Sequence, residues 1–283
     1  MPSLRTILAL GRLSRLPTIW SNCLAGWWLG GGGHAHHLPY LFAGATLLYW
    51  GAGFLNDAFD AEYDREHRRG RPIPAGAIAQ DSVWRWGLAW LVGGTLLLLC
   101  AGKVTGGLAL ALVFLIILYN TIHKLITFSP VLLGICRFFL YVLGASVAED
   151  GVTGWSIWCG LALGAYIIGF GYFARWERTP ALARYWPALL FFVPVGLALT
   201  MNAGRFREPA LLLSAVLVLW TLRCLRPTFW SAERNLTRTV SGLVAGIVFV
   251  DWLAIVGAPR ELSAAFILLF LLTLGLQRVL PET

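Results

Sequence analysis

The chain has 283 residues, of which 58% are hydrophobic and only 13% are charged, and its formal net charge is +8. Soluble domains carry about 25% charged residues, so this composition excludes an ordinary water-soluble globule. The apolar residues form continuous runs instead of the alternating pattern of a membrane barrel, which leaves helices to satisfy the backbone in lipid. We therefore predict an all-α, multispanning transmembrane bundle of nine to ten helices.

Apolar runs of about 20 residues, long enough to cross a bilayer, follow one another along the chain. No soluble domain is inserted between them, so we expect residues 1–283 to form a single integral-membrane domain. The predicted spans are 16–31, 38–58, 83–101, 105–122, 130–148, 155–173, 185–202, 209–225, 238–257 and 262–279.

Nearly all Lys and Arg residues fall on one side of the membrane when the N-terminus is placed in the cytoplasm. The exceptions are Lys103, Arg205, Arg207 and Arg260, while Arg137 lies within a span. The positive-inside rule therefore supports ten spans with both termini inside, and it accounts for the net charge of +8. We expect a lipid bilayer, and no nucleic acid, as the partner, and a bacterial inner (plasma) membrane as the location.

The second predicted span runs into an acidic stretch around which the chain is organised. On one helix, Asn56, Asp60 and Asp64 recur every four residues and form a stripe about 12 Å long on one face. Stacked carboxylates repel each other, which favours a cation between them. Oxygen ligands suit Mg²⁺, which keeps several waters and is shared with substrate phosphates. The stripe therefore predicts a metal–diphosphate site at the membrane surface, and the alternative is a solvated acidic loop.

Arginines follow the acidic stretch, and residues 71–76 read Arg-Pro-Ile-Pro-Ala-Gly. The whole string resembles the N-D-x-x-D-x-x-x-D and R-P-I-P-S-G motifs of the UbiA superfamily of intramembrane prenyltransferases, with Ala75 where Ser is common. The resemblance covers roughly residues 12–190 and disfavours the solvated loop. It implies a bundle around a central cavity open to the cytoplasm, Mg²⁺ as cofactor, and an isoprenyl diphosphate and a small acceptor as substrates.

The fourth predicted span ends in Tyr119-Asn120-Thr121-Ile122-His123-Lys124. A terminal Lys can simply reach the membrane interface. However, the Y-x-x-x-x-K spacing resembles a second superfamily motif, in which the Lys grips the diphosphate and the Tyr lies near the reacting carbon. Lys binds phosphate as a point charge, so we favour the functional interpretation.

Arg137 lies inside the fifth predicted span, where a charged side chain is costly and indicates function. The alternative is a structural ion pair, with Asp251 of the ninth span as the partner. The pattern C-R-x-x-x-x-x-x-G around Arg137 also resembles the EboC-like branch of the superfamily. Asn22, in the first span, either faces the cavity or bonds a neighbouring helix, and we favour the structural role.

The sixth predicted span ends in a segment where the superfamily usually carries a second set of Asp residues around a Y-A-x-x-D core. Glu177 then takes the place of the central Asp, whereas Phe170 and Ala181 take the flanking places and cannot bind a metal. One carboxylate thus remains. We expect Arg175 to contact phosphate directly and to replace part of the missing cation charge.

The resemblance implies ionisation of an isoprenyl diphosphate and transfer of the prenyl group to a small acceptor within the membrane. Two alternatives stay open: an intramembrane terpene cyclase, which ionises the same substrate without an acceptor, and a non-catalytic binding or transport-associated protein. The predicted residues are Asp60, Asp64, Tyr119 and Lys124 for catalysis; Asn56, Arg71, Lys124, Arg137 and Arg175 for the diphosphate; and Asn56, Asp60, Asp64 and Glu177 for the metal.

Overall fold

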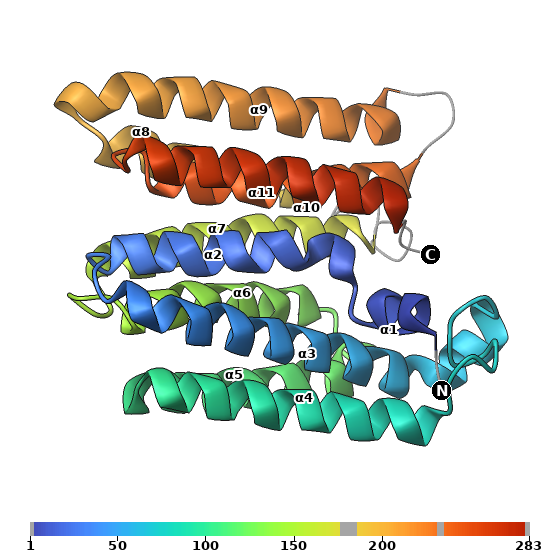
Figure 1. The fold of residues 1–283 in the computed structure, drawn as a ribbon. Helices are drawn as coiled ribbons and strands as arrows, with labels where there is room; N and C mark the ends of the chain where they lie inside the picture. The colour runs from blue at the N-terminus through green and yellow to red at the C-terminus, as the bar shows by residue number, and fades with distance from the viewer. Residues whose placement is uncertain (1–2, 176–185, 231–234, 281–283) are drawn as a thin grey trace.

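The computed structural model describes residues 3–175, 186–230 and 235–280, and within them every regular element is a helix (Figure 1). The elements are α1 (Leu4–Leu10), η1 (Leu13–Arg15), α2 (Leu16–Leu29), η2 (Ala35–His37), α3 (Leu38–His67), α4 (Gln80–Ala101), α5 (Lys103–Ile122), α6 (Ser129–Ser146), α7 (Gly154–Phe173), η5 (Trp186–Phe192), α8 (Val193–Met201), η6 (Gly204–Phe206), α9 (Arg207–Phe229), α10 (Leu236–Ala254) and α11 (Arg260–Val279).

Each of the ten predicted spans is helical, which confirms the all-α membrane bundle. Within the described residues, eight helices are long and apolar enough to cross a membrane. The first and seventh predicted spans are shorter: α2 has 14 residues, and η5 with α8 covers Trp186–Met201. Prolines explain where both helices begin. Pro17 and Pro194 lie in the first turns of α2 and α8, where a missing N–H is tolerated.

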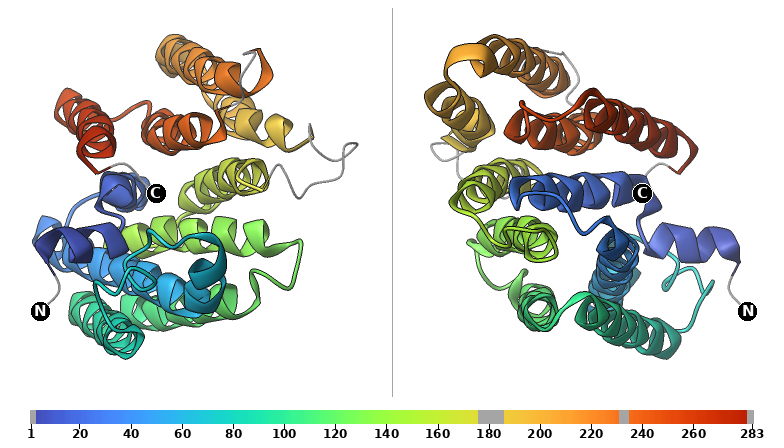
Figure 2. Two further views of the ribbon diagram at one scale, coloured as in Figure 1. Left: turned by 90° about the vertical axis from the view of Figure 1, so that its right-hand side faces the viewer. Right: turned by 60° about the vertical axis from the view of Figure 1, so that its left-hand side comes forward.

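The bundle has two parts that meet at α2. Helices α3 to α6 lie on one side of α2, and α9 to α11 lie on the other (Figures 1 and 2). Helix α2 packs against α3 and α6 from the first group and against α10 and α11 from the second. Neighbours in sequence pair as antiparallel hairpins, most closely α3 with α4, α6 with α7 and α9 with α10.

Glycines let α2 and α6 touch through their backbones. A Cβ atom added to Gly26 would lie 2.2 Å from the Tyr141 carbonyl oxygen, and one added to Gly144 would lie 2.2 Å from the Cys23 carbonyl oxygen. Small residues serve this purpose in membrane bundles, where close backbone approach supplies the packing energy that the hydrophobic effect cannot. The contact fixes α2 beside α6, and both helices line the cavity described below.

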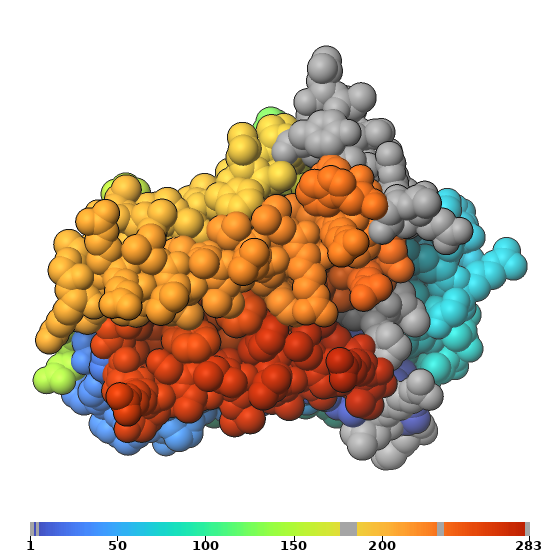
Figure 3. Space-filling model, turned by 90° about the horizontal axis from the view of Figure 1, so that it is seen from above, coloured from blue at the N-terminus to red at the C-terminus, as the bar shows by residue number. Residues whose placement is uncertain are grey.

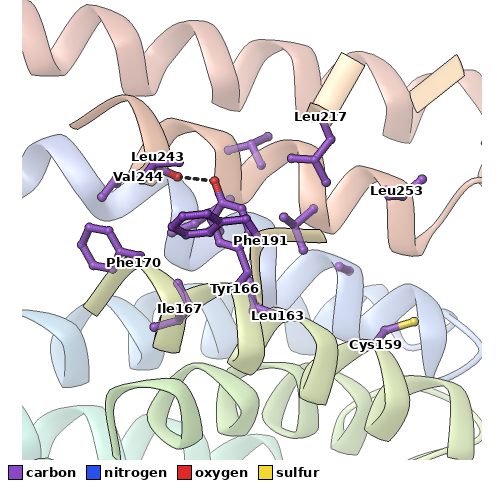
Figure 4. Packing of buried hydrophobic residues seen from close by; sticks show 14 of the residues in the cluster. Cys159, Leu163, Tyr166, Ile167, Phe170, Phe191, Leu217, Leu243, Val244 and Leu253 are labelled. Carbon is purple, nitrogen blue, oxygen red and sulfur yellow. Dashed lines mark hydrogen bonds between the residues drawn. The ribbon is translucent and has the colours of Figure 1, made fainter. Parts of the chain in front are cut away.

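A second packed region joins α7, η5, α9 and α10 (Figure 4). Tyr166 and Phe191 are fully buried there, with ring centroids 5.2 Å apart in an edge-to-face arrangement. The Tyr166 hydroxyl donates a hydrogen bond of 2.9 Å to the Leu243 carbonyl oxygen. A buried tyrosine needs such a partner, and this bond ties α7 to α10.

Helix α3 is longer than a membrane requires. Its 30 residues extend about 45 Å, whereas the hydrocarbon core of a bilayer is about 30 Å thick. The surplus turns lie at the C-terminal end of the helix, where its Asp and Glu residues begin. Helix α3 therefore carries its acidic residues to one end of the bundle, the end that also holds both chain termini (Figure 1).

Candidate functional site

The last turns of α3 present Asn56, Asp57, Asp60 and Asp64 at one end of the bundle. Asp57 and Asp64 are buried, with side chains 8% and 2% exposed. Buried carboxylates require cations or hydrogen bonds around them. Three other segments of the chain supply them, and the four segments together form the site.

The loop between α3 and α4 folds back over α3 and brings Arg71 to the carboxylates. Ile73 and Ile78 are buried against Phe54 and other side chains of α3, which holds the loop in place. Gly76 has a φ of +72°, a conformation that favours glycine and closes the turn. As a result, Arg71 Nη1 lies 2.9 Å from Asp57 Oδ1 and 3.9 Å from Asp64 Oδ2.

The segment after α5 places two further basic groups beside Asp60. Lys124 Nζ lies 2.6 Å from Asp60 Oδ1, and His123 Nε2 lies 3.3 Å from the same oxygen. The His123 ring stacks on Tyr119 at a centroid distance of 5.2 Å. Lys124 also lies over the ring of Tyr63, 5.1 Å from its centroid, a cation–π contact. The structure thus brings Tyr119 and Lys124 to the acidic stripe.

The N-terminal segment contributes Arg12, which the sequence analysis did not single out. Arg12 adopts a left-handed conformation with φ +46° and donates to Asn56 Oδ1, while its Nη2 lies 3.3 Å from Asp57 Oδ1. Asn56 in turn donates a bond of 3.1 Å to Asn120 Oδ1 on α5. Arg12 and Arg15 come just before the first apolar run, and the positive-inside rule places them on the same side of the membrane as the acidic stripe. This shared location was the sequence signal for the contact.

A cavity of about 270 Å³ leads from these residues into the bundle, which confirms the predicted central cavity. Its polar end is lined by Arg12, Arg15, Asn56, Tyr119, Asn120 and Arg175. Its apolar lining includes Ala45, Leu48, Leu112, Leu133, Leu140, Ile167, Phe170, Val244 and Ile247. A charged end joined to an apolar interior suits an amphiphile with an anionic head. Asp60, Asp64, Arg71 and Lys124 lie beside this end and are not among the lining residues.

Arg175 lines the cavity, and a hydrogen bond to the segment after α5 holds its guanidinium. Its Nη2 donates a bond of 2.9 Å to the His123 carbonyl oxygen, so it belongs to the same end as Lys124. Phe170, at the position of a missing Asp, also lines the cavity. Glu177, the predicted metal ligand of this segment, and Ala181 lie outside the described residues.

Arg137 lines the cavity but is bonded to α2. Its Nη1 donates to Thr18 Oγ1 at 3.1 Å and to Asn22 Oδ1 at 2.7 Å. Asn22 then donates a bond of 2.7 Å to Asp251 Oδ2. Arg137 is therefore linked to Asp251 through Asn22, and the structure does not bring it into contact with the carboxylates of α3 within the described residues.

The α3 carboxylates fit a magnesium ion only in part. Within the described residues no group of three or more His, Cys, Asp or Glu residues is arranged to hold a metal. However, Asp64 Oδ1 is buried and has no hydrogen-bond partner among them. An unpartnered carboxylate oxygen one helical turn from Asp60 is a donor that Mg²⁺ accepts, because this ion commonly uses one or two carboxylates together with water and substrate phosphates. The residues therefore fit Mg²⁺ bound jointly with a diphosphate.

The fold and the site define a multi-pass integral membrane protein with an apolar cavity whose open end carries opposed acidic and basic groups. Residues 16–181 match the UbiA prenyltransferase family, and the chain belongs to this family.

The chain is similar to two archaeal enzymes named digeranylgeranylglyceryl phosphate synthase. It is 40% identical to that of Methanothrix thermoacetophila over 87 residues, 29% of this chain and 32% of the relative. It is 37% identical to that of Ignicoccus hospitalis over 67 residues, 24% of this chain and 22% of the relative. The matched part of the chain thus spans a third or less of either relative.

A solved structure from work on digeranylgeranylglyceryl phosphate synthase in membranes has the same fold. The similarity has a TM-score of 0.62 at 16% sequence identity and covers 95% of this chain and 98% of that chain. At this identity the likeness establishes the arrangement of the helices, which confirms the fold expected from the sequence.

Proposed function

We propose that the protein is a Mg²⁺-dependent prenyltransferase that ionises an isoprenyl diphosphate and transfers the prenyl group to a small acceptor within the membrane. One observation carries this proposal: Arg175 lines the charged end of an apolar cavity, and the carboxylates of α3 lie beside this end with the cations Arg71 and Lys124. The prenyl chain would occupy the apolar interior, and the diphosphate would lie at the charged end.

The diphosphate would be bound by basic side chains from separate segments. Arg175 offers a planar fork suited to two phosphate oxygens, and Lys124 offers a point charge. Arg71 pairs with Asp57, and Asn56 accepts a hydrogen bond from Arg12. Both residues would therefore act at the diphosphate end of the substrate. Arg137 lies along the cavity wall, where we propose that it contacts the polar part of the substrate or of the acceptor.

Asp60 and Asp64 would hold Mg²⁺, with the amide oxygen of Asn56 and the carboxylate of Glu177 as the remaining proposed ligands. The bound ion would neutralise the negative charge that develops on the departing diphosphate. Lys124, 2.6 Å from Asp60, adds to this neutralisation from the protein side.

The chemical step breaks the bond between the allylic carbon and the diphosphate oxygen, and the electron pair leaves with the diphosphate. The Tyr119 ring lines the cavity beside the charged end and would stabilise the resulting cation by a cation–π contact. Two other aromatic residues, Phe138 and Tyr172, are not among the lining residues, whereas Tyr49 and Phe170 are. The acceptor then forms a bond to the allylic carbon and loses a proton.

A phosphate-bearing glyceryl acceptor is the class of acceptor that the relatives suggest, since their name describes a glyceryl phosphate with two geranylgeranyl groups. That name favours transfer over cyclisation. We propose that the charged end faces the cytoplasm of a bacterial cell, because nearly all Lys and Arg residues lie on that side.

Diphosphate release by the purified full-length protein tests the proposal. Geranyl, farnesyl and geranylgeranyl diphosphates would be supplied with Mg²⁺, with and without a glyceryl phosphate acceptor, beside Asp60→Asn and the control Asp81→Asn. Asp81 is an exposed carboxylate in the first turn of α4. We expect acceptor-dependent release that Asp60→Asn abolishes, that chelation removes and that Asp81→Asn retains. Release without acceptor, accompanied by a cyclic hydrocarbon, would contradict transfer and indicate a cyclase. No release under any condition would contradict the enzymatic proposal.

A further inference from the structure

A second charged site lies on the opposite part of the bundle, in a groove between α9 and α11. In Figure 2, α10 lies between these two helices, and in Figure 3 they run side by side across one face of the molecule. A pocket of about 520 Å³ opens here. It is lined by Trp220, Arg223, Cys224, Arg226 and Pro227 of α9, Arg238, Ser241 and Gly242 of α10, and Leu274 and Gln277 of α11. None of these residues belongs to the cavity described above.

The floor of this basic groove is held rigidly by hydrogen bonds. The Trp220 indole donates a bond of 2.8 Å to the Gly242 carbonyl oxygen, and the Gln277 amide donates one of 2.9 Å to the Ser241 carbonyl oxygen. A Cβ atom on Gly242 would lie 2.5 Å from Cys224 Sγ, so the glycine is needed where α10 meets α9. The three helices are therefore fixed relative to one another at this point.

The groove carries positive charge that the nearby helices do not neutralise. Arg223, Arg226 and Arg238 are exposed, and no carboxylate of the described residues forms an ion pair with any of them. Arg223 lies over the Trp220 ring, 5.5 Å from its centroid, which orients its guanidinium. The carboxylates of α9 and α11, Glu208 and Glu261, occupy the first turns of these helices, at the opposite end.

The surface next to the arginines is apolar and exposed. Leu219 and Leu222 of α9 are 67% and 42% exposed, and Leu271 of α11 is 57% exposed. Leu219 and Leu222 lie one turn before the arginines of α9, and Leu271 lies one turn before Leu274, which lines the pocket; all three belong to helices long and apolar enough to cross a membrane. The groove thus has a cationic end at the depth of lipid headgroups and an apolar wall at the depth of acyl chains.

We propose that this groove binds the phosphate headgroup of an anionic phospholipid. Arginine forks match phosphate oxygens in a bidentate manner. Basic pockets between membrane helices on the cytoplasmic side suit anionic headgroups, since each nearby Lys or Arg adds to the attraction. The lipid chains lie along Leu219 and Leu271, outside the bundle. This site is independent of the proposed reaction, so either can hold without the other.

Native mass spectrometry of the full-length protein in detergent tests the proposal, with phosphatidylglycerol and phosphatidylcholine as probes. One variant combines Arg223→Gln, Arg226→Gln and Arg238→Gln. The matched control combines Arg85→Gln, Arg207→Gln and Arg260→Gln, which removes equal charge from exposed positions elsewhere. We expect the wild type and the control to retain phosphatidylglycerol in preference to phosphatidylcholine, and the groove variant to lose roughly tenfold or more of this retention.

Equal retention by the groove variant and the control would overturn the proposal. Full displacement of phosphatidylglycerol by inorganic phosphate would also overturn it, because the site would then take a free anion. If the triple variant does not fold, the three single Arg→Gln variants carry the test. Each should lose part of the preference for phosphatidylglycerol, and unchanged preference in all three would exclude a headgroup site.

Discussion

Asp64 near the end of α3 and Asp251 of α10 are both buried, yet they are held in different ways. Asp251 of α10 is fully buried and accepts hydrogen bonds from neutral donors: Ser21, Asn22 at 2.7 Å and Tyr141 at 2.6 Å. Asp64 of α3 is 2% exposed, but its Oδ1 has no hydrogen-bond partner among the described residues.

This contrast separates a structural carboxylate from a functional one. A carboxylate that holds helices together has its oxygens saturated by the fold, because an unsatisfied buried acceptor is costly. A carboxylate that binds a ligand has an oxygen without a partner in the fold, and cations such as Lys124 lie near it. Four substitutions test this contrast.

Asp64→Asn should have the largest effect, and on activity alone. It neutralises a carboxylate whose Oδ1 has no hydrogen-bond partner among the described residues, so we expect diphosphate release to fall about 100- to 1,000-fold, the usual loss when one stabiliser of developing charge is removed. The melting temperature of the purified protein should change little. A large loss of stability with activity retained would contradict a ligand-binding role.

Asp251→Leu should have the next largest effect, and on stability. It removes the acceptor of Asn22 and Tyr141 between α2, α6 and α10, whereas Ser21 keeps the Thr18 carbonyl oxygen as a partner at 3.1 Å, so we expect a cost of about 3 kcal/mol. Thermal unfolding in detergent would measure the loss. Asp251→Asn, which keeps an acceptor at this position, should recover part of the stability. Unfolding temperatures equal to wild type for both variants would exclude a structural role.

Asn22→Ala should show whether Arg137 belongs to the structural network or to the site. Asn22 lies between Arg137 and Asp251, so its removal should cost about 1–2 kcal/mol of stability. If Arg137 contacts substrate, the variant should also raise the KM for the isoprenyl diphosphate, because the guanidinium loses its support. A lower melting temperature with an unchanged KM would assign Arg137 to the network.

Arg71→Lys should have the smallest effect. Lysine keeps the charge but not the planar guanidinium whose Nη1 lies 2.9 Å from Asp57 Oδ1 and 3.9 Å from Asp64 Oδ2, so we expect the KM to rise several-fold, equivalent to about 1 kcal/mol. Steady-state kinetics would measure it, with Arg85→Lys on α4 as the control. A KM equal in both variants would show that charge alone suffices at position 71.

Much of the fold was predictable from the sequence because run length and period act locally. The apolar runs gave the helices, and a period of four placed Asn56, Asp60 and Asp64 on one helix. The charge distribution placed Lys124 and Arg175 at the same end of the bundle, and the structure places both there.

Contacts between segments could not be predicted in the same way. Arg12 reaches Asn56 only because the chain turns through a left-handed residue, and His123 reaches Asp60 only after α5 has ended. Asp57 belongs to the acidic motif, but its pairing with Arg71 depends on how the following loop packs through Ile73 and Ile78. Such contacts depend on the three-dimensional packing, which spacing along the chain does not specify.

The hydrogen bond from Tyr166 to the Leu243 carbonyl oxygen affects how the length of the proposed prenyl chain in the cavity can change during evolution. It ties together α7 and α10, the two helices that supply Ile167, Phe170, Val244 and Ile247 to the cavity. These two helices therefore form a fixed wall on one side of the cavity. We therefore expect that lineages change the length of the accommodated chain by exchanging side-chain volumes on the facing helices, at positions such as Ala45 of α3 and Leu112 of α5, while the wall itself stays in place.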